Sequence, residues 1–283
     1  MKTLKALGGA LLAIVIMIAS NILASVAASG LILINAPEWL AIAVMGILYI
    51  VFVLLAVRLI YVKAFKFKPA ELGMPKPALK PACIVLAVLL PVVVCAAFFL
   101  FAKGEFVKAS ADGNRASLLA EGIVYNGIAA AIAEEVLFRG VLLNVFRKRW
   151  NTVVGVIVPS VIFGLIHITE MQEFNLLDCI QLVVAGTLVG IMFSVIAVRT
   201  GSVWNSAVVH SVWNLVMAGG IVKIGSAPSE NALVNYVLNS KSFALTGGAF
   251  GVESSVIAIA AYAAVALILV FAWKSEKHTV SAI

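Results

Sequence analysis

Long apolar runs follow one another along almost the whole chain, and this pattern constrains the fold more than any other feature. A helix needs about 20 predominantly apolar residues to cross the hydrocarbon core of a bilayer. The sequence therefore predicts an all-α fold, a polytopic integral membrane helix bundle with about eight transmembrane helices. The expected spans are residues 7–34, 40–60, 83–102, 118–146, 153–168, 176–198, 203–222 and 256–273.

Composition argues against a soluble or a nucleic-acid-binding protein. Charged residues make up only 12% of the chain and hydrophobic residues 63%, whereas soluble domains carry about 25% charged residues. The net charge of +7 would suit nucleic acid only if the basic residues formed one solvated patch, and here they are scattered between apolar runs. Cys83, Cys95 and Cys179 show no metal-type or disulfide-type spacing, which predicts apolar packing residues.

The distribution of charges predicts the orientation of the chain. Most Lys and Arg residues fall on loops that would share one side of the membrane with the N-terminus, while most acidic residues, including Glu170 and Glu253, fall on the other. Flanks rich in Lys and Arg tend to stay cytoplasmic. Both termini are therefore expected in the cytoplasm, and the short loops without an organelle signal favour the bacterial plasma membrane.

No repeat, low-complexity tract or soluble domain is visible, so residues 1–283 are expected to form one membrane domain with a catalytic motif core at about 118–222. The first apolar run has a second interpretation as a cleaved signal peptide. Lys2 and Lys5 precede its apolar part, and the small residues at 25–27 resemble a cleavage site. Because the run continues to Ile34, a membrane anchor is the simpler interpretation.

Glu134, Glu135 and Arg139 lie inside an apolar run, where a charge costs about 2.5–3.5 kcal/mol on insertion scales and usually serves a function. Glu135 and Arg139 are four residues apart, so they share a helix face and are expected to pair. Glu134 is turned by about 100° from Glu135 on a regular helix. We therefore expect Glu134 to point elsewhere and to act as a base.

Two more apolar runs carry one histidine each, His167 and His210, and Asn214 follows His210 by one helical turn. Each of these residues alone is more often a helix-to-helix hydrogen-bonding group than a catalyst. Together with the two carboxylates they place five costly polar groups in three apolar runs, which predicts a shared intramembrane cavity. The remaining histidine, His278, lies in the charged tail and is expected to be solvated.

Three motifs resemble the CPBP family of CAAX prenyl proteases and bacteriocin-processing or immunity proteins. Residues 134–140 (EEVLFRG) are similar to the family's EExxxR motif, and residues 163–167 (FGLIH) are similar to its FxxxH motif. Residues 201–204 (GSVW) and 210–214 (HSVWN) are similar to its HxxxN motif and the preceding Gly-Ser-x-Trp. The resemblance covers roughly residues 123–215.

The resemblance implies an intramembrane endopeptidase that acts on membrane-associated, lipidated or leader-type peptides. Glu134 and His167 would activate a water molecule, and His210 and Asn214 would hold the oxyanion. Glu135 and Arg139 would support Glu134. The expected partners are a peptide or protein substrate and the lipid bilayer, with no nucleic acid.

The resemblance leaves metal use open. Glu134, His167 and His210 could supply the three ligands of a catalytic zinc site, but the His-Glu-x-x-His spacing of many zinc peptidases is absent. The family is described both as metalloproteases and as glutamate-dependent peptidases, and we favour the second mechanism. Two other functions remain open: a non-catalytic immunity or scaffold protein, and an ion-coupled transporter.

The depths in the membrane that we expect for His167 and His210 do not agree. His167 would lie about 21 Å along a helix that begins at Val153, whereas His210 would lie only about 10 Å along its own helix. Two straight helices that start at the same level would keep these side chains apart. We therefore expect either that the membrane part of the fifth helix begins near Pro159 or that one helix bends around the cavity.

Overall fold

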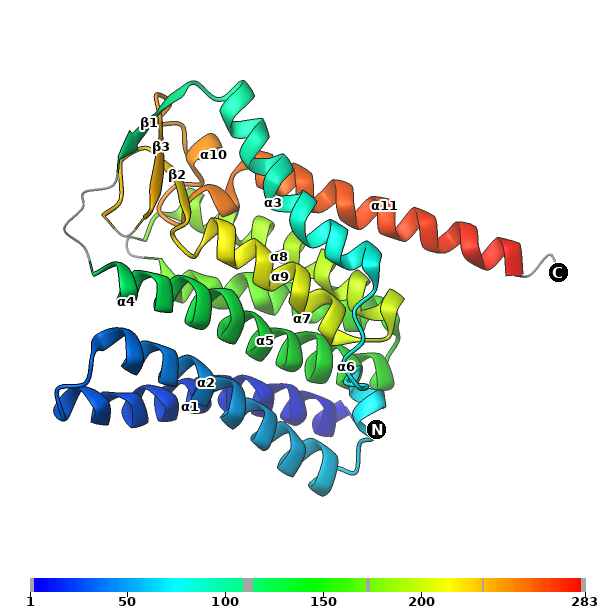
Figure 1. Ribbon diagram of the computed structural model, residues 1–283. Coiled ribbons are helices and arrows are strands. Elements are labelled where there is room, and N and C mark those ends of the chain that lie inside the picture. Colours follow the sequence, from blue (N-terminus) through cyan, green and yellow to red (C-terminus); the bar gives the residue numbers. More distant parts are fainter. Residues whose placement is uncertain (1–2, 109–113, 172–173, 231, 281–283) are drawn as a thin grey trace.

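The computed structural model describes residues 3–108, 114–171, 174–230 and 232–280, with side chains described as far as residue 272 (Figure 1). Lys2 and the side chain of His278 lie outside the described residues. The chain forms a helical bundle, as predicted. Its main helices are α1 (Thr3–Leu33), α2 (Glu38–Val57), α3 (Pro81–Phe101), α7 (Thr152–Ile166), α8 (Leu176–Thr200), α9 (Val203–Met217) and α11 (Val256–Val280).

The expected fourth span is a continuous helical rod in which α-helical and wider π-helical turns alternate. In chain order it consists of α4 (Arg115–Leu119), η3 (Ala120–Ala130), α5 (Ala131–Glu134), η4 (Glu135–Leu142) and α6 (Leu143–Arg149). This motif rod lies between the α1–α2 pair and the rest of the bundle (Figure 1). Two π-helical stretches on either side of α5 therefore set the direction of the side chains near Glu134.

Glycines let the helices around the motif rod approach one another closely. A Cβ atom on Gly186 of α8 would lie 2.6 Å from the Cα atom of Gly164 on α7. A Cβ atom on Gly122 of the motif rod would lie 2.0 Å from the carbonyl oxygen of Gly219, just after α9. Side chains at these positions would force the helices apart, as expected for small residues at membrane-helix crossings.

The position at which α9 begins explains how His167 and His210 reach the same depth in the bundle. The helix α7 begins at Thr152, so Pro159 lies inside it. The start of α9 is recessed into the bundle, where the Val203 N–H donates to the Gly73 carbonyl at 2.8 Å. Val203 also lies beside Gly140, nine residues before the end of the motif rod, or about 13 Å at the rise of an α-helix. This recess offsets the shorter distance of His210 along its own helix.

The predicted span 203–222 is wrong at its C-terminal end. The helix α9 stops at Met217, and Val222–Gly225 forms strand β2. With β1 (Gly104–Lys108) and β3 (Val234–Leu238) it makes a three-stranded sheet of order β1-β3-β2, antiparallel between β1 and β3 and parallel between β3 and β2. The chain leaves the helix at a pair of glycines, where Gly220 has a positive φ of 72°.

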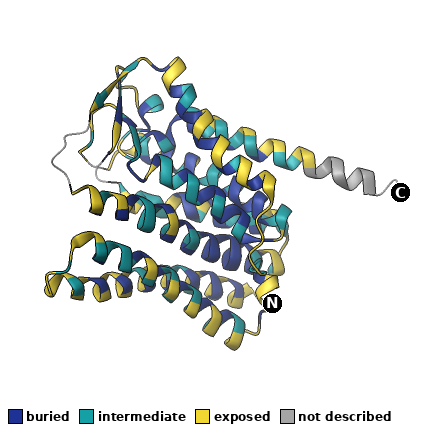
Figure 2. Cartoon of the chain, in the orientation of Figure 1, coloured by how far each residue is buried: buried dark blue, intermediate teal, exposed yellow. Residues whose placement is uncertain are grey.

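Many exposed apolar residues lie on the outer helices, while buried residues gather on the motif rod, α8 and α9 (Figure 2). Five described helical segments are long and apolar enough to cross a membrane: Thr3–Leu33, Glu38–Ala64, Pro81–Phe101, Thr152–Glu170 and Leu176–Thr200. The apolar part of α11 is shorter, and α9 has only 15 residues. The structure thus provides a helix for each expected span, whereas the number of membrane crossings stays a prediction.

Candidate active site

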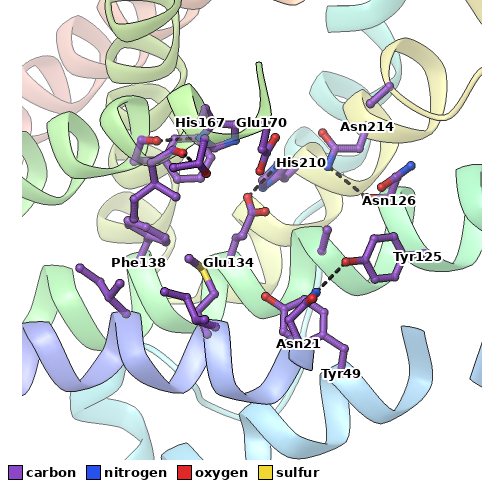
Figure 3. A pocket seen from close by; sticks show the side chains of 18 of the residues that line it. Asn21, Tyr49, Tyr125, Asn126, Glu134, Phe138, His167, Glu170, His210 and Asn214 are labelled. Carbon is purple, nitrogen blue, oxygen red and sulfur yellow. Dashed lines mark hydrogen bonds and ion pairs between the residues drawn. The ribbon is translucent and has the colours of Figure 1, made fainter. Parts of the chain in front are cut away.

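A cavity of about 650 Å³ lies between the α1–α2 pair, the motif rod, α9 and the C-terminal end of α7. The four residues predicted from the sequence, Glu134, His167, His210 and Asn214, all line it (Figure 3). They come from three separate segments of the chain. Folding therefore brings the carboxylate, the two imidazoles and the amide together at one cavity.

Glu135 and Arg139 form a buried ion pair behind this cavity. The Arg139 Nη1 atom lies 3.0 Å from Glu135 Oε1, and the two side chains are 1% and 0% exposed. Arg139 Nη2 also donates to the Gly190 carbonyl of α8, and the guanidinium lies 4.4 Å from the centre of the Phe163 ring. These contacts fix the motif rod against α7 and α8, because a buried charge is tolerated only when it is paired and hydrogen-bonded.

His210 joins the ion pair to the cavity. Its Nδ1–H donates to Glu135 Oε1 at 3.0 Å, and its ring stacks on Phe193 with the ring centres 4.5 Å apart. The Nε2 atom faces Glu134, whose Oε2 atom lies 3.8 Å away. Glu135 thus sets the orientation of the imidazole and leaves Nε2 for chemistry in the cavity.

His167 lies directly after the last turn of α7. Its Nδ1–H donates to the carbonyl of Phe163 at 2.7 Å, since a carbonyl oxygen can only accept a hydrogen bond. The neutral ring then carries its lone pair on Nε2. The Phe163 ring, 4.4 Å from the His167 ring centre, also packs against His210 and holds the two imidazoles on one side of the cavity.

Glu134 is the carboxylate that has no ion pair with Arg139. Its Oε2 atom is buried and makes no hydrogen bond to any described residue. The side chain points into the cavity (Figure 3), as its helical offset from Glu135 predicts. A buried carboxylate oxygen without a partner is costly, so this atom is suited to bind a water molecule or a substrate N–H.

Asn214 lies one helical turn after His210. Its Nδ2 atom donates one hydrogen to the carbonyl of Asn126 on the motif rod at 3.1 Å. A side-chain amide has two N–H donors, so a second one is left for a ligand in the cavity. The contact with Asn126 also ties α9 to the motif rod at the level of the site.

Glu134, His167 and His210 do not form a metal site in the observed arrangement. Within the described parts of the chain, no three His, Cys, Asp or Glu side chains converge closely enough to hold a metal ion. The distance of 3.8 Å between Glu134 Oε2 and His210 Nε2 suits a bridging water or a weak direct contact. We therefore assign no step of the chemistry to a metal.

Several residues that line the cavity were not predicted as site residues. Glu170 and Glu253 were assigned to loops but line the cavity, and the Trp213 Nε1–H donates to Glu253 Oε2 at 3.1 Å. Asn21 of α1 and Tyr125 of the motif rod also line it. An asparagine in the middle of an apolar helix was the signal that could have found Asn21, because such residues usually bond to another helix.

Comparisons with known proteins match the part of the chain that contains the candidate site. Residues 116–216 match the family model described as type II CAAX prenyl endopeptidase Rce1-like. Over 85 residues the chain is 38% identical to a protein of Escherichia coli named "Uncharacterized 24.3 kDa protein". That match covers 29% of this chain and 36% of the relative, so the chain spans about a third of the relative's length. No solved structure gives a significant match.

Proposed function

From the match of residues 116–216 to the Rce1-like family model, we propose that this chain is an intramembrane endopeptidase whose water nucleophile is activated by Glu134 and His167. The family supports a CAAX-type membrane protease in general terms. The substrates that fit the proposal are lipidated or leader-type peptides at the membrane.

The observation that carries the proposal is the unpartnered Oε2 atom of Glu134 inside a cavity that also holds both imidazoles. Glu134 accepts a proton from a bound water as the water attacks the scissile carbonyl. His167 supports this step through its Nε2 lone pair, because its Nδ1–H is held by the Phe163 carbonyl. A base within hydrogen-bond reach of the attacking water typically contributes about 10²–10⁴-fold in rate.

His210 and Asn214 stabilise the oxyanion of the tetrahedral intermediate. The Nε2 atom of His210 donates when it is protonated, and its Nδ1–H stays on Glu135. Asn214 donates the amide hydrogen that Asn126 does not use. One such donor is worth about 3–4 kcal/mol in the transition state of comparable reactions. The proton on Glu134 then passes to the leaving amine, which completes hydrolysis.

Purified protein in detergent tests this proposal with a lipidated and a plain peptide library. Wild type should cleave at least one library, and Glu134→Gln should lose cleavage while it keeps the melting temperature of wild type. A zinc chelator should leave the wild-type rate unchanged. Equal cleavage by Glu134→Gln would remove the mechanism, and loss of cleavage with chelator would assign a metal to the site.

The same samples separate the alternative functions. If neither library is cleaved, reconstitution into liposomes distinguishes the transporter, which moves ions across the bilayer, from a scaffold or immunity protein, which does not. Cleavage that depends on Glu134 contradicts both alternatives.

A further inference from the structure

One wall of the cavity carries polar groups that the hydrolytic mechanism does not use. Asn21 of α1, Tyr49 of α2 and Tyr125 of the motif rod line the cavity on the side that faces the α1–α2 pair (Figure 3). We call these three residues the polar wall. The other residues of α1 that line the cavity are apolar, such as Ile14 and Ile18, so Asn21 is a local exception on this helix.

The hydrogen bonds of the polar wall leave a donor and an acceptor free. Asn21 Nδ2 donates to the Tyr125 hydroxyl oxygen at 2.6 Å. Since Tyr125 accepts this bond, its own O–H remains available to donate, and the Oδ1 atom of Asn21 remains available to accept. One free donor beside one free acceptor is the complement of a peptide unit, which offers a C=O and an N–H.

Tyr49 adds a second hydroxyl without a partner. Its side chain is only 4% exposed, and its ring stacks on Tyr125 with the centres 6.4 Å apart. Its hydroxyl makes no hydrogen bond to any residue in the described part of the chain. Because Tyr49 lines the cavity, its hydroxyl is placed to form a hydrogen bond with a ligand there.

The π-helical turns of the motif rod bring the polar wall into register with Glu134. Tyr125 and Glu134 are nine residues apart, so a regular α-helix would point them in nearly opposite directions. Tyr125 lies in the π-helical stretch η3, and both side chains line the same cavity. The two residues are separated by at most about 13 Å along the rod, which equals about four residues of extended peptide.

We propose that the polar wall binds the main chain of an extended substrate peptide about three to four residues from the scissile bond. The Tyr125 O–H donates to a substrate carbonyl, and Asn21 Oδ1 accepts the neighbouring N–H. This inference rests on the proposed function and deepens it, because it makes peptide length on one side of the cleaved bond a determinant of turnover. It implies a substrate that enters the membrane cavity as an extended strand.

A peptide series that grows by one residue at a time on each side of the cleaved bond tests the length dependence. For wild type, kcat/KM should rise about tenfold when one side reaches three to four residues, as expected for a gained buried hydrogen bond. In Tyr125→Phe the ratio of kcat/KM between long and short peptides should fall toward one, with the change mainly in KM. An equal loss for all lengths would show a structural role only and overturn the proposal.

Tyr61→Phe is the matched control, because Tyr61 is also a buried tyrosine. Its hydroxyl donates to the Gly9 carbonyl, outside the cavity, so this variant should keep the wild-type ratio between long and short peptides.

A binding measurement keeps the test independent of hydrolysis. The longest peptide is titrated into Glu134→Gln and into the double variant Glu134→Gln, Tyr125→Phe, with the melting temperature of each protein recorded. We expect about tenfold weaker binding by the double variant. Equal affinity of the two proteins would overturn the polar wall as a binding site, whatever the outcome of the cleavage assay.

Discussion

Two adjacent carboxylates of the motif rod have different surroundings. Each carboxylate has one buried oxygen without a hydrogen bond to any described residue, but Glu135 is fully buried between Arg139 and His210, whereas Glu134 faces the cavity. The difference follows from a rotation of about 100° between neighbouring positions of a helix. In the proposed mechanism, Glu135 is thus a positioning residue that acts through His210, and Glu134 reacts with water.

Loss of the buried ion pair should destabilise the protein strongly. In Arg139→Ala, Glu135 would be left as an unpaired buried charge, which typically costs about 3–5 kcal/mol. We expect a lower melting temperature and loss of cleavage together, and the same direction for Glu135→Gln. Lys148→Ala is the control, because Lys148 forms an exposed ion pair with Glu71, and such pairs contribute about 0–1 kcal/mol. A stable but inactive Arg139→Ala would instead indicate a direct role in catalysis.

Glu253 should make stability depend on pH. Burial raises the pKa of this carboxyl above its ordinary value of 4.5, although Lys223, the Trp213 N–H, His167 and His210 act in the opposite direction. A raised pKa means that the folded state holds the proton more tightly than the unfolded chain. This contribution is fully present below pH 4.5 and is lost as pH rises through the folded pKa.

Glu253→Gln removes the titration but keeps an oxygen for the Trp213 N–H. The melting temperature of the variant relative to wild type should therefore increase between pH 4.5 and pH 8. Thermal unfolding in one detergent at both pH values measures the difference. A constant difference across this range would contradict the raised pKa.

The charged residues inside apolar runs could be predicted as site residues from the sequence. The charged residues near the ends of these runs could not. The divergence of Glu134 and Glu135 was predictable, because it depends only on helix geometry. Glu170 and Glu253 could not be placed, since residues at run ends are compatible with either solvent or a cavity. The pairing of Asn21 with Tyr125 joins segments 104 positions apart, and helix periodicity carries no information on such a contact.

At the scale of elements, the apolar runs predicted where helices occur. They did not predict which side chains face the cavity or how deep in the bundle each helix begins. Periodicity gives no sign of the π-helical turns that bring Tyr125 to the cavity, because each depends on packing against neighbouring helices. The recess of α9 depends on a backbone hydrogen bond between Gly73 and Val203. The sheet was missed because β2 continues the apolar run of α9, and short apolar runs fit either structure.

Close packing of the motif rod on the end of α9 predicts a severe effect of a single methyl group. Gly122→Ala would place a Cβ atom 2.0 Å from the Gly219 carbonyl oxygen, so backbone must move. We expect about 1–3 kcal/mol of destabilisation, as is typical of overpacking, and reduced cleavage because Asn214 and Asn126 lie at the same crossing.

Gly8→Ala is the matched control for this substitution, because no atom beyond the local backbone of α1 would lie within 4 Å of a Cβ atom at Gly8. Thermal unfolding of both variants should show a loss for Gly122→Ala and no loss for Gly8→Ala. Equal melting temperatures would contradict the tight crossing.

At the scale of the whole molecule, the two ends of the bundle differ in charge and in structure. One end holds the start of α1 and the basic C-terminal end of the motif rod, where Arg149 donates to the Thr3 hydroxyl and Lys148 pairs with Glu71. The sheet lies at the opposite end (Figure 1). The cavity extends toward that sheet end, since Glu253, which lines it, accepts a hydrogen bond from Trp213 near the C-terminal end of α9, and the chain enters β2 shortly after α9.

This polarity predicts that the cavity is reached from the outer side of a bacterial plasma membrane. Basic flanks tend to stay cytoplasmic, so Lys66, an exposed residue after α2, should face the cytoplasm, and Lys241, an exposed residue after β3, should face outward. Labelling of intact cells with an impermeant maleimide should modify Lys241→Cys but modify Lys66→Cys only after lysis. The native Cys83, Cys95 and Cys179 are buried, which keeps the background low. The reverse pattern would place the termini outside and the sheet end in the cytoplasm, so the substrate would then have to be a cytoplasmic peptide.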